Sequence, residues 1–417
     1  MKKYFILAAA AVVAMAACSK VETIDNTPDS PIRFSVVNHL QQTKATTGLT
    51  YPTTVPFGTF AWWTQNTWEN TADDAKKNFV FMDNEQISWH ALEAGAAEVW
   101  APVNLYYWTK TGKITFASYS PYTADGTDKG YSEIPVYNVA KGFLFNDYTI
   151  VDATNVDLMW ANLAANCSKT TNTDGTEVYD GTTGVNGTDH GYAGVPTIFN
   201  HALCQVGFEF RAIGRKNPNV SEIKIEVTDV DIVNIDNKGS FTQIPAETTP
   251  ATPRWATDHA NATANYDYAP AAALVLDLLD GTDNSVVSAT NNYTPLRKVA
   301  TDTDPYTRIL LPQALLETAD ANNANVLEDI ATTNDQKLVV KYTIKIKYTS
   351  SNDWATEDVV STVRLNNGTI AAWADNQNIT YRISINPYAT IPVTFDPAIV
   401  DWTDVYSTDV NINEFDD

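Results

Sequence analysis

The sequence predicts an all-β protein built from two β-sandwich domains in tandem. Apolar and polar residues alternate along many short segments, most clearly over the eleven residues from Leu338 to Tyr348, and a period of two is typical of a half-buried antiparallel strand. Gly, Pro, Asn and Asp lie between these segments, as they do in the turns between strands. Helical periodicity is almost absent, with one expected turn at residues 326–330.

The same alternation predicts strands throughout the chain. A central strand is expected at residues 114–119, which are apolar or small on both faces. The complete set of predicted strands is 32–37, 56–63, 79–82, 114–119, 204–210, 223–227, 338–348, 359–365 and 379–385. Many strands with turn residues between them favour sandwich architecture.

Two stretches interrupt the strand pattern. Residues 166–194 are rich in Thr, Asn, Asp and Gly, so we expect a long exposed loop there, and residues 245–270 carry four prolines among Ala and Thr, as a linker does. A boundary within the second stretch gives an N-terminal sandwich domain at 45–250 and a C-terminal one at 251–417.

The N-terminus has the pattern of a lipoprotein signal peptide. Two lysines precede an apolar run at residues 5–14, which is too short to span a bilayer comfortably. Small residues then lead directly to Cys18. We therefore expect a signal peptide at 1–17, lipid on Cys18, and a lipidated segment at 18–44 that includes the first strand. Several acyl chains on one residue hold a protein at a membrane durably.

The charge of the mature chain is strongly negative. Without residues 1–17, which carry two lysines and no acid, 25 basic residues face 50 acidic ones, a net charge of −25. Such a charge argues against nucleic acid and against an anionic membrane surface as partners. Because it is spread along the chain, it is typical of the solvated surface of an extracellular protein.

Catalytic and metal-binding motifs are absent from the sequence. It contains no nucleophile elbow, zinc-protease motif, phosphate-binding loop or dinucleotide fingerprint, and its five histidines are not spaced as metal ligands. Asp229 and Asp231 fail the EF-hand pattern because Val233 takes the third ligand position. The sequence therefore predicts a protein without enzymatic activity, cofactor or metal, although a weak calcium site in the Asp-rich turns near 280–284 and 302–304 stays open.

Cysteines and tryptophans leave alternatives open. Cys204 shares a face with apolar residues and is interpreted as a core thiol, whereas Cys167 is expected in the polar loop. A disulfide between them and two separate thiols are both compatible with the sequence. Trp62, Trp63 and Trp68 lie close together in the sequence; they either form a surface platform for sugar stacking or fill a sandwich core.

A series of short segments runs in order along the chain. They are Ile32-Arg33-Phe34, Lys44-Ala45, Pro56-Phe57-Gly58-Thr59-Phe60-Ala61, Tyr107-Trp108, Ile114-Thr115-Phe116-Ala117-Ser118-Tyr119-Ser120-Pro121, Val156-Asp157-Leu158-Met159-Trp160-Ala161, Phe199-Asn200-His201-Ala202-Leu203, Leu310-Leu311-Pro312-Gln313, Trp373 with Ile379-Thr380-Tyr381, and Val400-Asp401-Trp402. With the start at Cys18, this order resembles the Mfa-like and FimA-like fimbrillins of Bacteroidales. Thr109 departs from the pattern, because the family often has Pro after the Trp.

The resemblance implies a structure and a mechanism. Such subunits have two transthyretin-like β-sandwich domains, are exported as lipoproteins, are cut by a trypsin-like protease after the first strand, and polymerise by strand exchange. Lys44 is the one basic residue between 38 and 54, so the expected cut lies between Lys44 and Ala45. The incoming strand is expected from the tail, where Val405, Val410 and Ile412 are apolar.

Partners and location follow from the same resemblance. The expected partners are other fimbrial subunits, the outer membrane through the lipid, and ligands on host or bacterial surfaces, with the protein in a cell-surface fimbria. Two alternatives remain open at this point: a tip or anchor subunit of the same family, and a surface glycan-binding lipoprotein that uses the tryptophan cluster.

Overall fold

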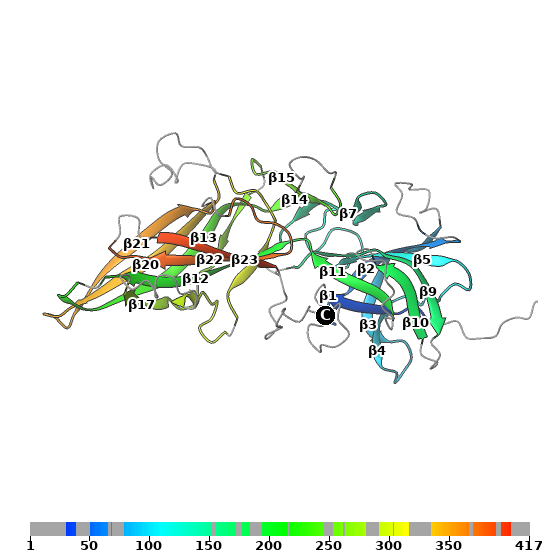
Figure 1. Ribbon diagram of the computed structural model, residues 1–417, viewed down its shortest axis with the longest axis horizontal. Coiled ribbons are helices and arrows are strands. Elements are labelled where there is room, and N and C mark those ends of the chain that lie inside the picture. The colour runs from blue at the N-terminus through cyan, green and yellow to red at the C-terminus, as the bar shows by residue number, and fades with distance from the viewer. Residues whose placement is uncertain are drawn as a thin grey trace, which may run out of the picture.

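The protein is elongated and consists of β-strands (Figure 1). The computed structural model describes residues 31–38, 51–65, 68, 79–151, 156–171, 177–183, 194–215, 217–245, 253–261, 263–280, 292–302, 304–316, 335–366, 370–388 and 393–401. These ranges contain no α-helix, and therefore no helix that is long and apolar enough to cross a membrane. The predicted all-β fold class is confirmed.

The first sheet closes on itself. Its order is β10-β9-β5-β2-β3-β4-β1-β11-β8, and β8 also pairs with β5, so the seven strands from β5 through β1 to β8 form a closed ring from which β9 and β10 extend. The strands are β1 (Phe34–Asn38), β2 (Phe57–Thr64), β3 (Val80–Ala91), β4 (Glu98–Pro102), β5 (Lys113–Ser120), β8 (Met159–Ala161), β9 (Ala164–Thr171), β10 (Glu177–Thr183) and β11 (Val195–His201).

The second sheet occupies the opposite end of the molecule (Figure 1). Its main order is β21-β20-β13-β17-β12-β22-β23, with β16 on β13 and with β18 and β19 on β12. The strands are β12 (Cys204–Gly214), β13 (Val220–Asp236), β16 (Thr263–Asp267), β17 (Leu274–Asp280), β18 (Thr294–Pro295), β19 (Thr307–Leu310), β20 (Lys337–Tyr348), β21 (Trp354–Arg364), β22 (Gln377–Ile385) and β23 (Val393–Asp401).

A small third sheet packs against the first. Its order is β15-β14-β7-β6. The strands are β6 (Val136–Asn138), β7 (Gly142–Thr149), β14 (Lys238–Thr242) and β15 (Trp255–Thr257). Aromatic side chains of β5 and β7, among them Tyr119 and Phe143, form a core between the two sheets. A separate core fills the interior of the ring, and a third core belongs to the second sheet.

The predicted strands occur in the structure, because alternation is a local property of each segment. Each of the nine predicted segments overlaps an observed strand, and Leu338–Tyr348 matches β20 almost residue for residue. The two stretches expected to be irregular also contain strands, which is a correction. Residues 166–194 include β10 and most of β9, and residues 245–270 include β15 and β16. β9 pairs with β5 and β10, β15 pairs with β14, and β16 pairs with β13. Composition does not reveal this stabilisation.

The strand pairing crosses the expected domain boundary at residue 250. β12 and β13 lie before that residue, yet they pair with β22 and β20, which lie after it. β14 and β15 flank the boundary and pair with each other, and β14 also pairs with β7. The change from the first sheet to the second therefore falls between β11 and β12, and a domain division at 250 stays a prediction.

Candidate functional site

The first strand lies between β11 and β4 in the closed ring (Figure 1). β1 pairs in parallel with β11 at five positions, from Phe34↔Val195 to Asn38↔Phe199. Its pairing with β4 is antiparallel and consists of a single position, Phe34↔Trp100. β1 is therefore the element that closes the ring on this side, and we call its position between β4 and β11 the β1 seat.

Alternation orients the side chains of β1. Ile32 and Phe34 are 0% and 5% exposed, Val36 is partly buried, and Arg33 between them is exposed. The ring of Phe34 meets Phe57 and Phe116 edge to face, each at 5.6 Å between ring centroids. Edge-to-face pairs add to the energy of burial. The β1 seat is thus an apolar groove in the interior of the ring, filled by alternate residues of one strand.

Gly194 allows β11 to approach β1 closely. A Cβ at this position would lie 2.8 Å from the carbonyl carbon of Phe34 and 2.9 Å from both the carbonyl oxygen of Arg33 and the nitrogen of Ser35. These are main-chain atoms, which cannot move away as the end of a flexible side chain can. A Cβ would therefore clash with them, and only glycine fits at this position. Sequence reasoning missed this residue, and its only signal was a glycine just before an apolar strand.

Tyr51 anchors the chain where the described part resumes after β1. Its ring is buried, stacks on Phe199 at 5.0 Å, and its hydroxyl shares a 2.6 Å hydrogen bond with Ser120 Oγ. Burial raises the pKa of Tyr51 well above its usual value, so the phenol is neutral at physiological pH. Residues 39–50 thus connect two segments that are both packed into the interior of the ring.

Most of the predicted site residues lie outside the described part of the chain. These residues are Cys18, Lys44, Ala45, Val405, Val410 and Ile412. They therefore stay predictions based on sequence.

The tryptophan platform is not supported by the positions of its side chains. Trp62 and Trp68 are each 4% exposed, and they pack against one another with 5.7 Å between ring centroids. Trp63 is partly buried, and its Nε1 donates a hydrogen bond to the Thr111 carbonyl at 2.8 Å. Because successive side chains of β2 point to opposite faces, Trp62 turns into the core shared with the third sheet. The core interpretation of Trp62 and Trp68 is the one that the structure supports.

Cys167, Cys204 and His201 are all buried. Cys167 and Cys204 are both buried and carry free thiols, so the expectation that Cys167 lies in an exposed polar loop is wrong. Burial raises the pKa of the Cys204 thiol well above its usual value, which makes it unreactive. His201 is buried, and its Nδ1 lies 2.8 Å from Asp157 Oδ2. This contact makes His201 a hydrogen-bonded structural histidine.

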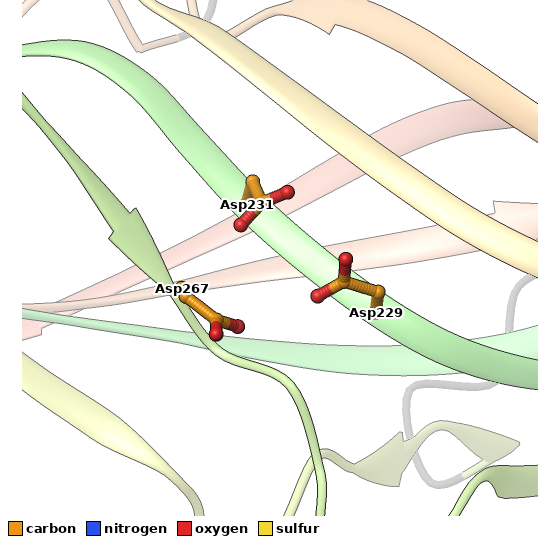
Figure 2. Close-up of side chains that lie close together, drawn as sticks. All are labelled: Asp229, Asp231 and Asp267. Atoms are coloured by element: carbon orange, nitrogen blue, oxygen red, sulfur yellow. The ribbon is translucent and has the colours of Figure 1, made fainter.

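Three aspartates gather on the surface of the second sheet. Figure 2 shows the carboxylates of Asp229 and Asp231 on β13 and Asp267 on β16 in one cluster, and their ligand atoms lie within 4.8 Å of one another. Lys341 on β20 bonds to Asp229 and lies 3.3 Å from Asp231 Oδ2. Burial and the charge of Asp229 raise the pKa of Asp231. Since the ammonium group neutralises part of the cluster, these carboxylates need no metal ion to account for their approach.

A solved structure of a fimbrial protein shares this fold. A fimbrial protein from Bacteroides vulgatus is 20% identical, with a TM-score of 0.51, and the match covers 89% of this chain and 99% of that one. A fimbrilin from Porphyromonas gingivalis is 8% identical, with a TM-score of 0.34, over 89% of this chain and 96% of that one. No curated protein matches the sequence.

The family assignment comes from the sequence as a whole. The sequence model of the fimbrillin-like family matches residues 43–402. This match includes every described strand except β1. It agrees with the all-β fold, with the likeness to the fimbrial protein from Bacteroides vulgatus, and with the resemblance that the ordered segments predicted. The chain therefore belongs to the fimbrillin-like family.

Proposed function

We propose that this fimbrillin is exported as a lipoprotein, is cut after its first strand, and polymerises by strand exchange into a surface fimbria. Family membership makes the chain a structural, non-enzymatic subunit of a cell-surface fimbria that serves adhesion. Under the proposal, lipid on Cys18 first holds the subunit at the outer membrane, and cleavage between Lys44 and Ala45 then releases it from that anchor.

The β1 seat is the observation that carries the proposal. Removal of β1 leaves the edges of β4 and β11 unpaired beside the apolar positions of Ile32 and Phe34. Such an edge is a template for an incoming strand. Three apolar side chains at the positions of Ile32, Phe34 and Val36 contribute roughly 5 kcal/mol before the entropy of ordering the strand is counted. A strand from another subunit can thus restore what the cut removes.

The position of the expected cut fits this arrangement. Lys44 lies between the end of β1 and the anchored residue Tyr51, so cleavage there separates β1 from the rest of the ring without cutting a described strand. The family match begins at residue 43. The match therefore covers the chain that would remain after the proposed cut, up to residue 402.

Lys44→Gln is expected to abolish polymers. A trypsin-like protease needs a basic residue before the scissile bond, so the variant should stay as a lipidated monomer that begins at Cys18, whereas wild-type surface material should form a ladder that begins at Ala45. The measurement is N-terminal sequencing and non-denaturing electrophoresis of material sheared from cells. Lys20→Gln is the matched control and should polymerise normally.

Either of two results would contradict the proposed cut. The first is a wild-type polymer that starts at Cys18, and the second is one that starts at Phe34, after Arg33. A wild-type lipidated monomer that trypsin leaves intact would instead indicate an anchor subunit. Trp62 and Trp68 do not support the glycan-binding alternative, because both are buried in the core.

Deletion of residues 404–417 is expected to leave folded monomers that no longer polymerise. This tail contains Val405, Val410 and Ile412, and we propose that it supplies the incoming strand. The deleted residues follow β23, the last described strand, so the sheets should keep their stability in thermal unfolding. Polymers that survive the deletion would refute the role of the tail and would direct attention to a tip subunit or to another donor segment.

A further inference from the structure

β1 is held unequally along its length. The two residues directly before it have main-chain partners on both sides: Ile32 N donates to the Tyr106 carbonyl at 2.8 Å, and Val195 N donates to the Arg33 carbonyl at 2.8 Å. Phe34 pairs with both β4 and β11. From Ser35 to Asn38, the pairings within the described part of the chain are to β11 alone.

Burial and backbone approach follow the same gradient. Ile32 and Phe34 are buried in the interior of the ring, whereas Val36 is only partly buried. The close approach at Gly194 also involves the start of the strand, at Arg33 to Ser35. Segments with fewer pairings and less buried apolar surface open at lower free energy. The end of β1 should therefore open before its start.

We propose that an incoming strand from a second copy of this chain first contacts the edge of β11 at Thr197–Phe199, and then displaces β1 from its end toward its start. We call this edge the entry edge. The inference rests on the proposed strand exchange and adds its direction. A cut in residues 39–50 frees the end of β1 that is held on one side only, so the entry edge is uncovered while Ile32 and Phe34 remain in place.

The entry edge recognises main-chain groups of the incoming strand, whereas the β1 seat recognises its side chains. Thr197, Ile198 and Phe199 are themselves buried, so first contact is made through backbone N–H and C=O groups and accepts any extended segment. Selection follows later, when the incoming strand must fill the positions of Phe34 and Ile32. A segment without apolar side chains at the two alternate positions of Phe34 and Ile32 should bind the entry edge and then dissociate.

Hydrogen exchange on the uncut chain tests the gradient. The amide of Val37 should exchange at least tenfold faster than that of Ser35, because both face β11 and opening from the end exposes Val37 first. Equal protection along β1, or faster exchange at its start, would overturn the proposed direction. This measurement needs neither cleavage nor polymers.

Displacement kinetics test the entry edge directly. In the chain cut after Lys44, a labelled N-terminal fragment is displaced by a synthetic peptide of residues 31–38 or by one of residues 31–35. The shorter peptide keeps Ile32 and Phe34 but lacks residues 36–38, which pair with the entry edge. The longer peptide should accelerate release in proportion to its concentration, and the shorter one should leave release at its spontaneous rate. Release by the longer peptide at a rate independent of its concentration would overturn the inference.

The two proposals fail in different ways. Polymers that form in cells, with displacement independent of peptide concentration, would leave strand exchange standing and remove the entry edge. A cut chain that shows the expected displacement but never polymerises in cells would keep the entry edge and remove the proposed function.

Discussion

Phe34→Ala is expected to lower the free energy of unfolding of the uncut chain by about 3–5 kcal/mol, the usual range for a buried Phe. The Phe34 side chain is 5% exposed and packs edge to face on Phe57 and Phe116. Truncation of the Phe34 side chain leaves a cavity inside the closed sheet, next to β1. Urea unfolding followed by tryptophan fluorescence measures the change, since Trp100 lines the same core.

Arg33→Ala is the matched control for Phe34→Ala. Arg33 is the neighbouring residue and is exposed, so its truncation should change the free energy of unfolding by at most about 0.5 kcal/mol. Equal losses in the two variants would mean that the pairing of β1, and not the side chain in the seat, supplies the stability. The proposed recognition of apolar side chains by the seat would then be wrong.

Arg364→Ala is expected to destabilise the second sheet by about 3–5 kcal/mol, because it removes a charged hydrogen-bond donor from a buried carboxylate. The Asp335 side chain is 0% exposed, and Arg364 Nε donates to its Oδ2 at 2.9 Å. The pair joins the segment before β20 to the end of β21. Denaturant unfolding followed by circular dichroism is the measurement.

Arg382→Ala provides the comparison for Arg364→Ala. Arg382 makes a similar 3.1 Å contact with Glu209, but both side chains are about a quarter exposed, so water replaces much of the lost interaction and the expected loss is about 1 kcal/mol. A combined Asp335→Leu and Arg364→Met variant should recover most of the stability, since it removes the buried carboxylate together with its charged donor. If the combined variant were as unstable as Arg364→Ala, the loss of a charged donor from the buried carboxylate would not be the cause.

The sequence by itself determined the features that are local along the chain. Alternation in Leu338–Tyr348 predicted β20, because successive side chains of a strand point to opposite faces regardless of which strand lies beside it. The ordered segments from Ile32 to Trp402 predicted the family, which depends only on residue order. Lipidation at Cys18 and cleavage after Lys44 are predictions of the same local kind.

Tertiary structure decided which segments meet. Alternation shows which side chains share a face of the sheet, but it does not show which strand lies beside the segment. The pairing of β12 and β13 with strands beyond residue 250 therefore had no signal in the sequence. The polar context of Cys167 predicted a loop, and the aromatic context of Trp62 fits either surface or core, but long-range packing buried both residues. The β1 seat itself arises because β11, more than 150 residues away in the sequence, approaches β1 at Gly194. Hydrogen bonds and close contacts between such distant residues depend on the folded arrangement, and no pattern within either segment encodes them.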